Sequence, residues 1–153
     1  MQARSAASFA VPSLAFAALT ALTALALPAL AEDLRTPSPE GARVFIISPE
    51  DGATVSSPVT VVFGIEGMEV VPAGTDTPAS GHHHLIVDLP QDEVDVAHAI
   101  PADDHHIHFG GGQTETTLEL APGTHSLWLL LGDANHVPHD PPVMSEPIEV
   151  TVE

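Results

Sequence analysis

The chain has 153 residues, no cysteine, and 21 acidic residues against three arginines, so its formal net charge is −18 at pH 7. Such an acidic surface repels phosphate backbones and anionic lipids, which argues against nucleic acid and membrane surfaces as partners. The absence of cysteine excludes disulfides, thiolate metal sites and a catalytic thiol.

Residues 1–31 have the features of a cleavable signal peptide. Arg4 precedes a long apolar run from Phe9 to Leu27, and Ala29-Leu30-Ala31 has the small residues typical of a cleavage site before Glu32. An uncleaved anchor is the competing interpretation, because the run approaches the length of a membrane span. The segment predicts a periplasmic or secreted protein, and we expect no membrane association beyond this export signal.

The remaining chain predicts a short linker and one domain. Residues 32–42 are polar and rich in proline, which is typical of a flexible linker. Seven later segments have the β-branched composition or the alternation of strands, and turn residues separate them. They are residues 43–48, 59–65, 82–89, 105–109, 114–120, 124–131 and 146–152. With no amphipathic helix beyond the leader, residues 43–153 are predicted to be all-β, as a single immunoglobulin-like antiparallel β-sandwich of about seven strands.

The histidines are concentrated in two of these strands. Six of the ten lie at 82–84 and 105–108. Side chains at i and i+2 leave a strand on the same face, so His82 pairs with His84 and His106 pairs with His108. His83 lies on the opposite face with Leu85 and Val87, so we expect it to be a core residue with a satisfied ring.

Strand pairing can bring the scattered histidines together. If residues 82–89 pair antiparallel with 124–131, the loop carrying His136 and His139 lies over His82 and His84. If residues 105–109 pair along the other edge of 82–89, His106 and His108 reach the same end of the domain. His125 then falls at the opposite end and His98 lies in an acidic loop, so both are excluded from the site.

Such a cluster predicts a metal site. Three or four neutral imidazoles suit copper(II) or zinc, and nickel is a further candidate. The candidate ligands, in order of preference, are His84, His106, His108, His82, His136 and His139. The candidate acceptors for the ring N–H groups that face away from the ion are Asp88, Asp104, Asp133 and Asp140.

The predicted function is an exported periplasmic protein that binds a divalent transition metal, copper or zinc, for storage or delivery, with a periplasmic protein as a further candidate partner. One alternative is a non-catalytic structural or protein- or glycan-binding module whose histidines form a hydrogen-bonded scaffold. A third is a metal-dependent hydrolase, which needs an open coordination position beside a pocket. No nucleophile elbow or phosphate loop is present, so the enzyme question stays open and a non-enzyme is favoured.

Three motifs resemble a known family. Gly-His-His-His-Leu-Ile-Val-Asp at 81–88, His-Ile-His-Phe-Gly-Gly-Gly-Gln-Thr-Glu-Thr at 106–116 and Leu-Gly-Asp-Ala-Asn-His-Val-Pro-His-Asp-Pro-Pro-Val-Met-Ser at 131–145 are similar to the bacterial exported domain of unknown function 4399. The resemblance covers about Val44 to Val152. It implies a small, immunoglobulin-like domain in the periplasm or outside the cell, and it implies no activity.

Overall fold

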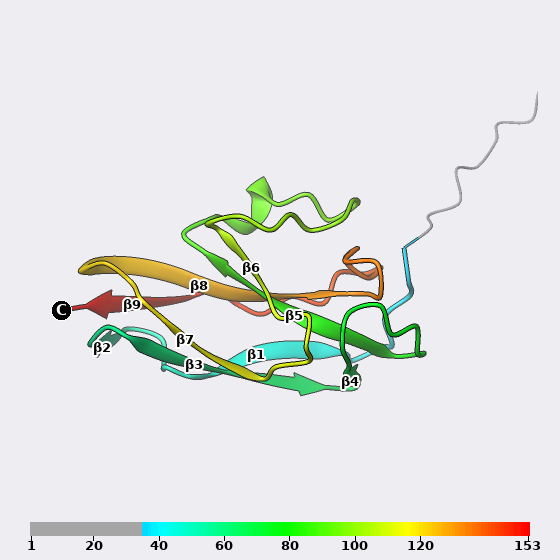
Figure 1. Ribbon diagram of the computed structural model, residues 1–153, viewed down its shortest axis with the longest axis horizontal. Helices are drawn as coiled ribbons and strands as arrows, with labels where there is room; N and C mark the ends of the chain where they lie inside the picture. The colour runs from blue at the N-terminus through cyan, green and yellow to red at the C-terminus, as the bar shows by residue number, and fades with distance from the viewer. Residues whose placement is uncertain (1–34) are drawn as a thin grey trace, which may run out of the picture. The chain divides into compact units, whose positions relative to one another are not determined.

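A computed structural model describes residues 35–153, which belong to one compact unit, Asp33–Glu153 (Figure 1). The predicted signal peptide lies outside the described residues. Within residues 35–153, no helix has the length and apolar character needed to cross a membrane.

The described residues form nine strands and one short 3₁₀ helix. In chain order these are β1 (Arg43–Ser48), β2 (Ala53–Val55), β3 (Val59–Glu66), β4 (Glu69–Val70), β5 (Ser80–Val87), η1 (Gln91–Glu93), β6 (His106–His108), β7 (Glu115–Leu118), β8 (Gly123–Gly132) and β9 (Ile148–Val152). The all-β prediction is confirmed. The two strands that were not predicted, β2 and β4, are only three and two residues long, which is too short to show a period of two.

The strands form two sheets that lie in two layers (Figure 1). One sheet has the order β1-β3-β7, and the other has the order β2-β9-β8-β5-β4, with β6 also paired to β5. The main core lies between the layers, where Val61 and Phe63 of β3 meet Leu85 of β5 and Leu129 of β8. These are alternate positions on their strands, as burial of one face of a strand requires.

A second, smaller apolar cluster lies on the other face of β5 and β8. It contains Ile86, Ile100, Trp128 and Leu130. The segment between β5 and β6, predicted as an irregular acidic loop, covers this face, and the Trp128 ring nitrogen donates a hydrogen bond to the Leu89 carbonyl. Every residue of β5 is buried, including the histidines on its outer face. We call the segment between β5 and β6, residues 88–105, the covering segment.

The two pairings on which the site prediction depends are both present. β5 runs antiparallel to β8, with His83 opposite Leu131. β6 runs antiparallel along the other edge of β5, with His84 opposite His108. The end of β8 therefore lies beside the beginning of β5, and the loop after β8 starts next to His82.

Part of the predicted linker, residues 32–42, is attached to the domain. Pro37 forms a parallel bridge with Asp140, the Ser38 amide donates to the Asp140 carbonyl, and the Asp140 amide donates to the Thr36 carbonyl. We call residues 35–38 the N-terminal strap. The strap runs beside the loop that follows β8.

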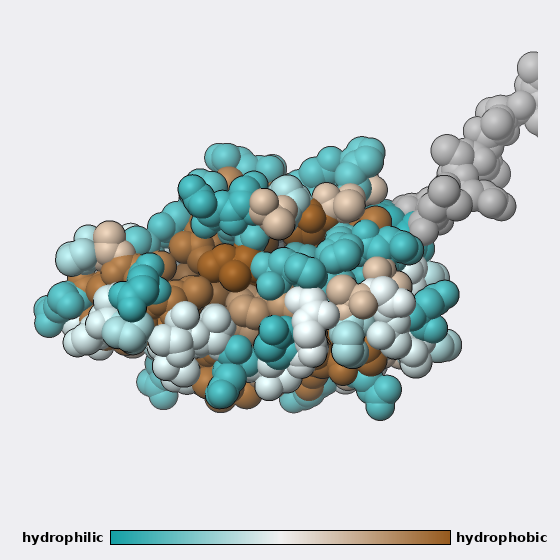
Figure 2. All heavy atoms as spheres, viewed as in Figure 1, coloured by the Kyte–Doolittle hydropathy of each residue, from teal (hydrophilic) through white to brown (hydrophobic). Residues whose placement is uncertain are grey.

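The outer surface agrees with the acidic composition. Figure 2 shows hydrophilic residues over the covering segment and along the rims of this face, with hydrophobic residues visible between the two layers. Among the described residues, Ile47 is the exposed large hydrophobic side chain, at 55 % exposure.

Candidate metal centre

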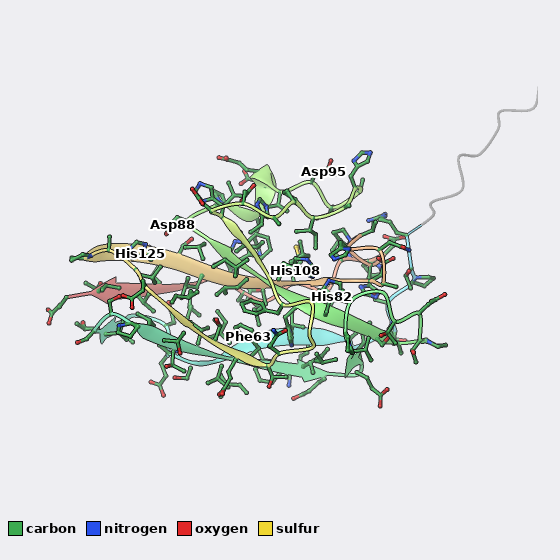
Figure 3. The ribbon with its side chains drawn as sticks, in the orientation of Figure 1. Phe63, His82, Asp88, Asp95, His108 and His125 are labelled. Atoms are coloured by element: carbon green, nitrogen blue, oxygen red, sulfur yellow. The ribbon has the colours of Figure 1, made fainter. Side chains whose placement is uncertain are left out.

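Four histidine rings meet on the outer face of β5. His82 and His84 come from β5, His108 from β6 and His136 from the loop after β8. The ring centroids of His82 lie 4.8 Å from His84, 5.0 Å from His108 and 4.9 Å from His136. His108 lies 5.1 Å from His84 and 4.7 Å from His136. We call these four residues the histidine cluster, and Figure 3 shows two of its members, His82 and His108, close together.

Strand geometry places the first three members. His82 and His84 share a face because they are two residues apart in β5, and register sets His108 opposite His84. Two glycines leave room for the rings. A Cβ atom at Gly132 would lie 2.7 Å from Cε1 of His84, and one at Gly110 would lie 2.4 Å from Cε1 of His108.

The loop after β8 supplies the fourth member in a backbone conformation that is unusual for histidine. His136 has a φ of 67°, in the left-handed region that non-glycine residues rarely occupy. Strained residues of this kind often occur at functional sites. The conformation sets the His136 ring against those of His82 and His108.

Burial favours the neutral form of the rings of His82, His84 and His108. Desolvation, and then repulsion from His136 and His108, lowers the pKa of His82 to about 4. Desolvation, and then repulsion from His82 and its neighbours, lowers the pKa of His84 to about 3. The same two causes lower the pKa of His108. Neutral imidazole is the form that binds a metal ion.

The buried rings have no hydrogen-bond partner among residues 35–153. Within that range neither ring nitrogen of His82 or His84 has one, although all four atoms are inaccessible to solvent. Native proteins pair most buried polar atoms, so an unpaired set requires an explanation such as an ion or a bound water. His108 is exposed and gives the cluster an opening to solvent.

The distances between ligand atoms are close to those of a metal site. One ring nitrogen from each of His82, His84 and His108 lies within 4.8 Å of the other two. Two nitrogens that bind one ion at about 2.0–2.1 Å are at most about 4.2 Å apart, and about 3.4 Å apart in the tetrahedral geometry of zinc. For the three residues to share one ion, the most widely separated nitrogens would therefore have to approach each other by up to about 1.4 Å.

The other two predicted ligands lie outside the cluster. His106 lies opposite Ile86, whereas His108 lies opposite His84. The Nδ1 atom of His106 donates to Asp103 at 2.8 Å. His139 is buried and its Nε2 donates to the Ser80 carbonyl at 3.2 Å. The structure thus brings together His82, His84, His108 and His136 of the six predicted residues.

The predicted carboxylate acceptors make other contacts. Asp88 accepts from His125, and Asp140 pairs with Arg35 in the strap. Asp133 accepts from the Thr36 hydroxyl and from two backbone amides, and Asp104 is exposed. Asp103, which was not predicted, accepts a hydrogen bond from the ring of His106, one of the six predicted ligands. Its signal was its position three residues before His106 in a turn.

The excluded histidines are accounted for. His98 pairs with Asp95 in the covering segment, and His125 lies with Asp88 toward the other end of the domain (Figure 3). His83 faces the core as predicted, with its ring 5.2 Å from that of Phe63. Neither His83 nitrogen has a hydrogen-bond partner in the described part of the protein, so no protein group supplies the satisfied ring that was expected. Desolvation lowers the pKa of His83 to about 4.

Comparison with known proteins identifies a family and nothing more specific. No curated protein and no solved structure matches the chain. The model of one family, described as Domain of unknown function (DUF4399), matches residues 61–153, which include every member of the histidine cluster. Because this match covers more than half of the sequence, the chain belongs to the DUF4399 family of domains of unknown function.

Proposed function

We propose that this protein binds one divalent transition metal ion, copper(II) or zinc, through His82, His84 and His108, with His136 as a fourth ligand. The observation that carries the proposal is the pair of buried, neutral rings at His82 and His84, whose nitrogens have no partner among the described residues and lie beside a third histidine. An ion would bind the one lone pair that each neutral ring offers. The exposed side of His108 gives the ion a route in and out, which fits storage or delivery.

The scaffold alternative fits the same residues less well. Histidines that serve as a hydrogen-bonded scaffold need partners for their ring nitrogens, as His106 has in Asp103. The rings of His82 and His84 have none in the described part of the protein.

A hydrolase would need a substrate pocket beside the ion. A cavity of the described domain lies beside β1 and the 144–148 segment, lined by residues such as Phe45 and Met144, and no member of the histidine cluster lines it. Our proposal is therefore limited to ion binding, with no catalytic step assigned to the site.

The test is a metal titration of protein purified without a His-tag or a metal-affinity column. We expect one Cu²⁺ or Zn²⁺ per chain at pH 7.5, measured by competition with a chromophoric chelator and by elemental analysis after dialysis. His84→Ala and His108→Ala should each weaken binding at least tenfold. His98→Ala is the matched control, because His98 is an exposed histidine outside the cluster. Binding that is absent from the wild type, or unchanged in His84→Ala, would refute the proposal.

We further propose that the domain is exported to the periplasm and that its two facing sheets are an immunoglobulin-like sandwich. The strands, in two layers around one main core, support the sandwich.

The leader-like residues 1–31 support export. Expression of the full chain in a Gram-negative host tests export, since protein recovered from the periplasm should begin at Glu32. Retention in the membrane with an intact N-terminus would contradict cleavage.

A further inference from the structure

We infer that Thr36, in the N-terminal strap, is a positioning residue for the fourth ligand of the proposed site, because its hydroxyl holds the Asp133 carboxylate that sets the His136 backbone. This inference rests on the proposed ion binding. Contacts made by the strap would then influence how tightly the proposed site binds its ion.

His136 is the cluster member that needs the most support from its surroundings. The other three are fixed by strand register, whereas His136 lies in a loop with a φ of 67°. L-residues leave this conformation unless neighbouring contacts hold them there. A relaxed backbone would move the ring away from its positions 4.9 Å from His82 and 4.7 Å from His108.

Asp133 supplies those contacts from both sides of His136. Its Oδ1 accepts from the amide of Asn135 at 2.8 Å and from that of Val137 at 3.0 Å. Its backbone carbonyl accepts from the His136 amide at 3.0 Å, and its own amide donates to the Val137 carbonyl at 2.9 Å. Asp133 is only 6 % exposed, so its carboxylate is buried against this loop.

Thr36 completes the arrangement. Its hydroxyl donates to the second carboxylate oxygen, Oδ2 of Asp133, at 2.8 Å. The rest of the strap fastens the far end of the same loop, where Ser38 and Pro37 bond or bridge to Asp140. The strap therefore restrains the segment 133–140 at both ends, and Thr36 is the residue that reaches the carboxylate.

The test compares ion affinities of the full-length mature protein, measured with Zn²⁺ and Cu²⁺ by chelator competition at pH 7.5. Thr36→Val removes the hydroxyl at nearly constant volume and should weaken binding about tenfold, the lower end of the usual effect of residues that support metal ligands. Thr36→Ser keeps a hydroxyl and should restore wild-type affinity. Ser38→Ala is the matched control, because its hydroxyl donates to the Pro141 carbonyl and does not touch Asp133.

A double mutant separates positioning from general stabilisation. If Thr36 acts through His136, then Thr36→Val should weaken binding no further, within about twofold, once His136→Ala has removed the ligand. An effect on ion binding that does not act through His136 predicts that the two losses multiply. A role in general stability alone predicts a lower Tm of the ion-free Thr36→Val protein with unchanged ion affinity.

The outcomes distinguish this inference from the proposed function. Wild-type protein that binds no ion overturns both. Wild-type protein that binds one ion, with Thr36→Val binding equally well or with multiplying losses in the double mutant, overturns only the role of Thr36. A tenfold loss that Thr36→Ser restores and that vanishes in the His136→Ala background supports it.

Discussion

His83 and His84 are neighbours in β5 that point to opposite faces, and each buries two ring nitrogens that have no partner in the described domain. An unsatisfied buried polar group costs about 1–3 kcal/mol. We therefore predict that His83→Leu raises the free energy of unfolding by about 1–3 kcal/mol and leaves ion binding intact. His84→Leu should also stabilise the ion-free protein, but it should abolish binding. Urea unfolding in EDTA, together with metal titration, measures both.

A loss of stability in His83→Leu would contradict this prediction. A destabilised His83→Leu protein would mean that the His83 ring makes a favourable contact in the core, such as a hydrogen bond to a buried water. In that case an unsatisfied ring could not be used as an argument for an ion at His84 either.

The pKa of His125 is raised, whereas those of His83 and His84 are lowered. Its Nδ1 donates to Asp88 at 2.7 Å and its Nε2 donates to the Ala121 carbonyl at 2.8 Å, and only a protonated ring can donate from both nitrogens. These hydrogen bonds raise its pKa, with Asp88 as the main cause. The stability that they give is complete below the unfolded pKa of about 6.5 and is lost as the pH rises through the raised folded value.

We predict that Asp88→Asn lowers the pKa of His125 toward its ordinary value, measured by NMR titration of the ring protons. Asp95→Asn is the matched control, because Asp95 forms the same kind of pair with His98 and should leave His125 unchanged. An unaltered His125 pKa in Asp88→Asn would show that the carboxylate is not its main partner.

At the scale of elements, β5 could be predicted well from sequence and its surroundings could not. The alternation of His82, His84 and Ile86 against His83, Leu85 and Val87 indicated a strand with a core face, and the pairings with β8 and β6 are as predicted. Burial of the outer face was missed. The covering segment is irregular and acidic, so no periodicity marked Ile100 as part of a second apolar cluster.

Gly132 gives a prediction at the same scale. It ends β8 opposite His82, and a Cβ atom there would lie 2.7 Å from His84 Cε1 and 3.4 Å from the His136 Cα atom. Gly132→Ala should therefore displace the His84 ring, weaken ion binding at least tenfold and cost about 1–3 kcal/mol of stability from overpacking. Gly111→Ala is the control, since its Cβ would meet only the exposed Gln113 side chain. Unchanged ion affinity in Gly132→Ala would mean that the ring has room to move.

At the scale of the whole molecule, contacts between distant segments decided what the sequence could not predict. Strand topology predicted that His136 lies over the site, and its ring is found 4.9 Å from that of His82. The hydrogen bond of Thr36 to Asp133, 97 residues away, depends on loop conformations that no period or spacing describes. For the same reason the docked strap, residues 35–38, looked like a free linker.

The three consecutive histidines of β5 also give the whole domain a characteristic response to acid. Their folded pKa values, about 4 for His82, about 4 for His83 and about 3 for His84, are below the unfolded value of about 6.5. Between these limits the unfolded chain binds protons that the native state does not. Stability is therefore complete above about pH 6.5 and falls as the pH drops toward about 4, by up to about 1.4 kcal/mol per pH unit for each histidine.

Urea unfolding in EDTA at pH 7, 6 and 5 measures this slope, over a range where most carboxylates remain ionised. His83→Leu removes one of the three groups and should reduce the slope by up to about 1.4 kcal/mol per pH unit. A stability that stays constant from pH 7 to pH 5 would mean that the histidines are protonated in the folded state. Rings with a pKa near 6.5 are still mostly neutral at pH 7.5, so this result would contradict the lowered pKa values of the ion-free protein and leave the metal titration at pH 7.5 as the test of the site.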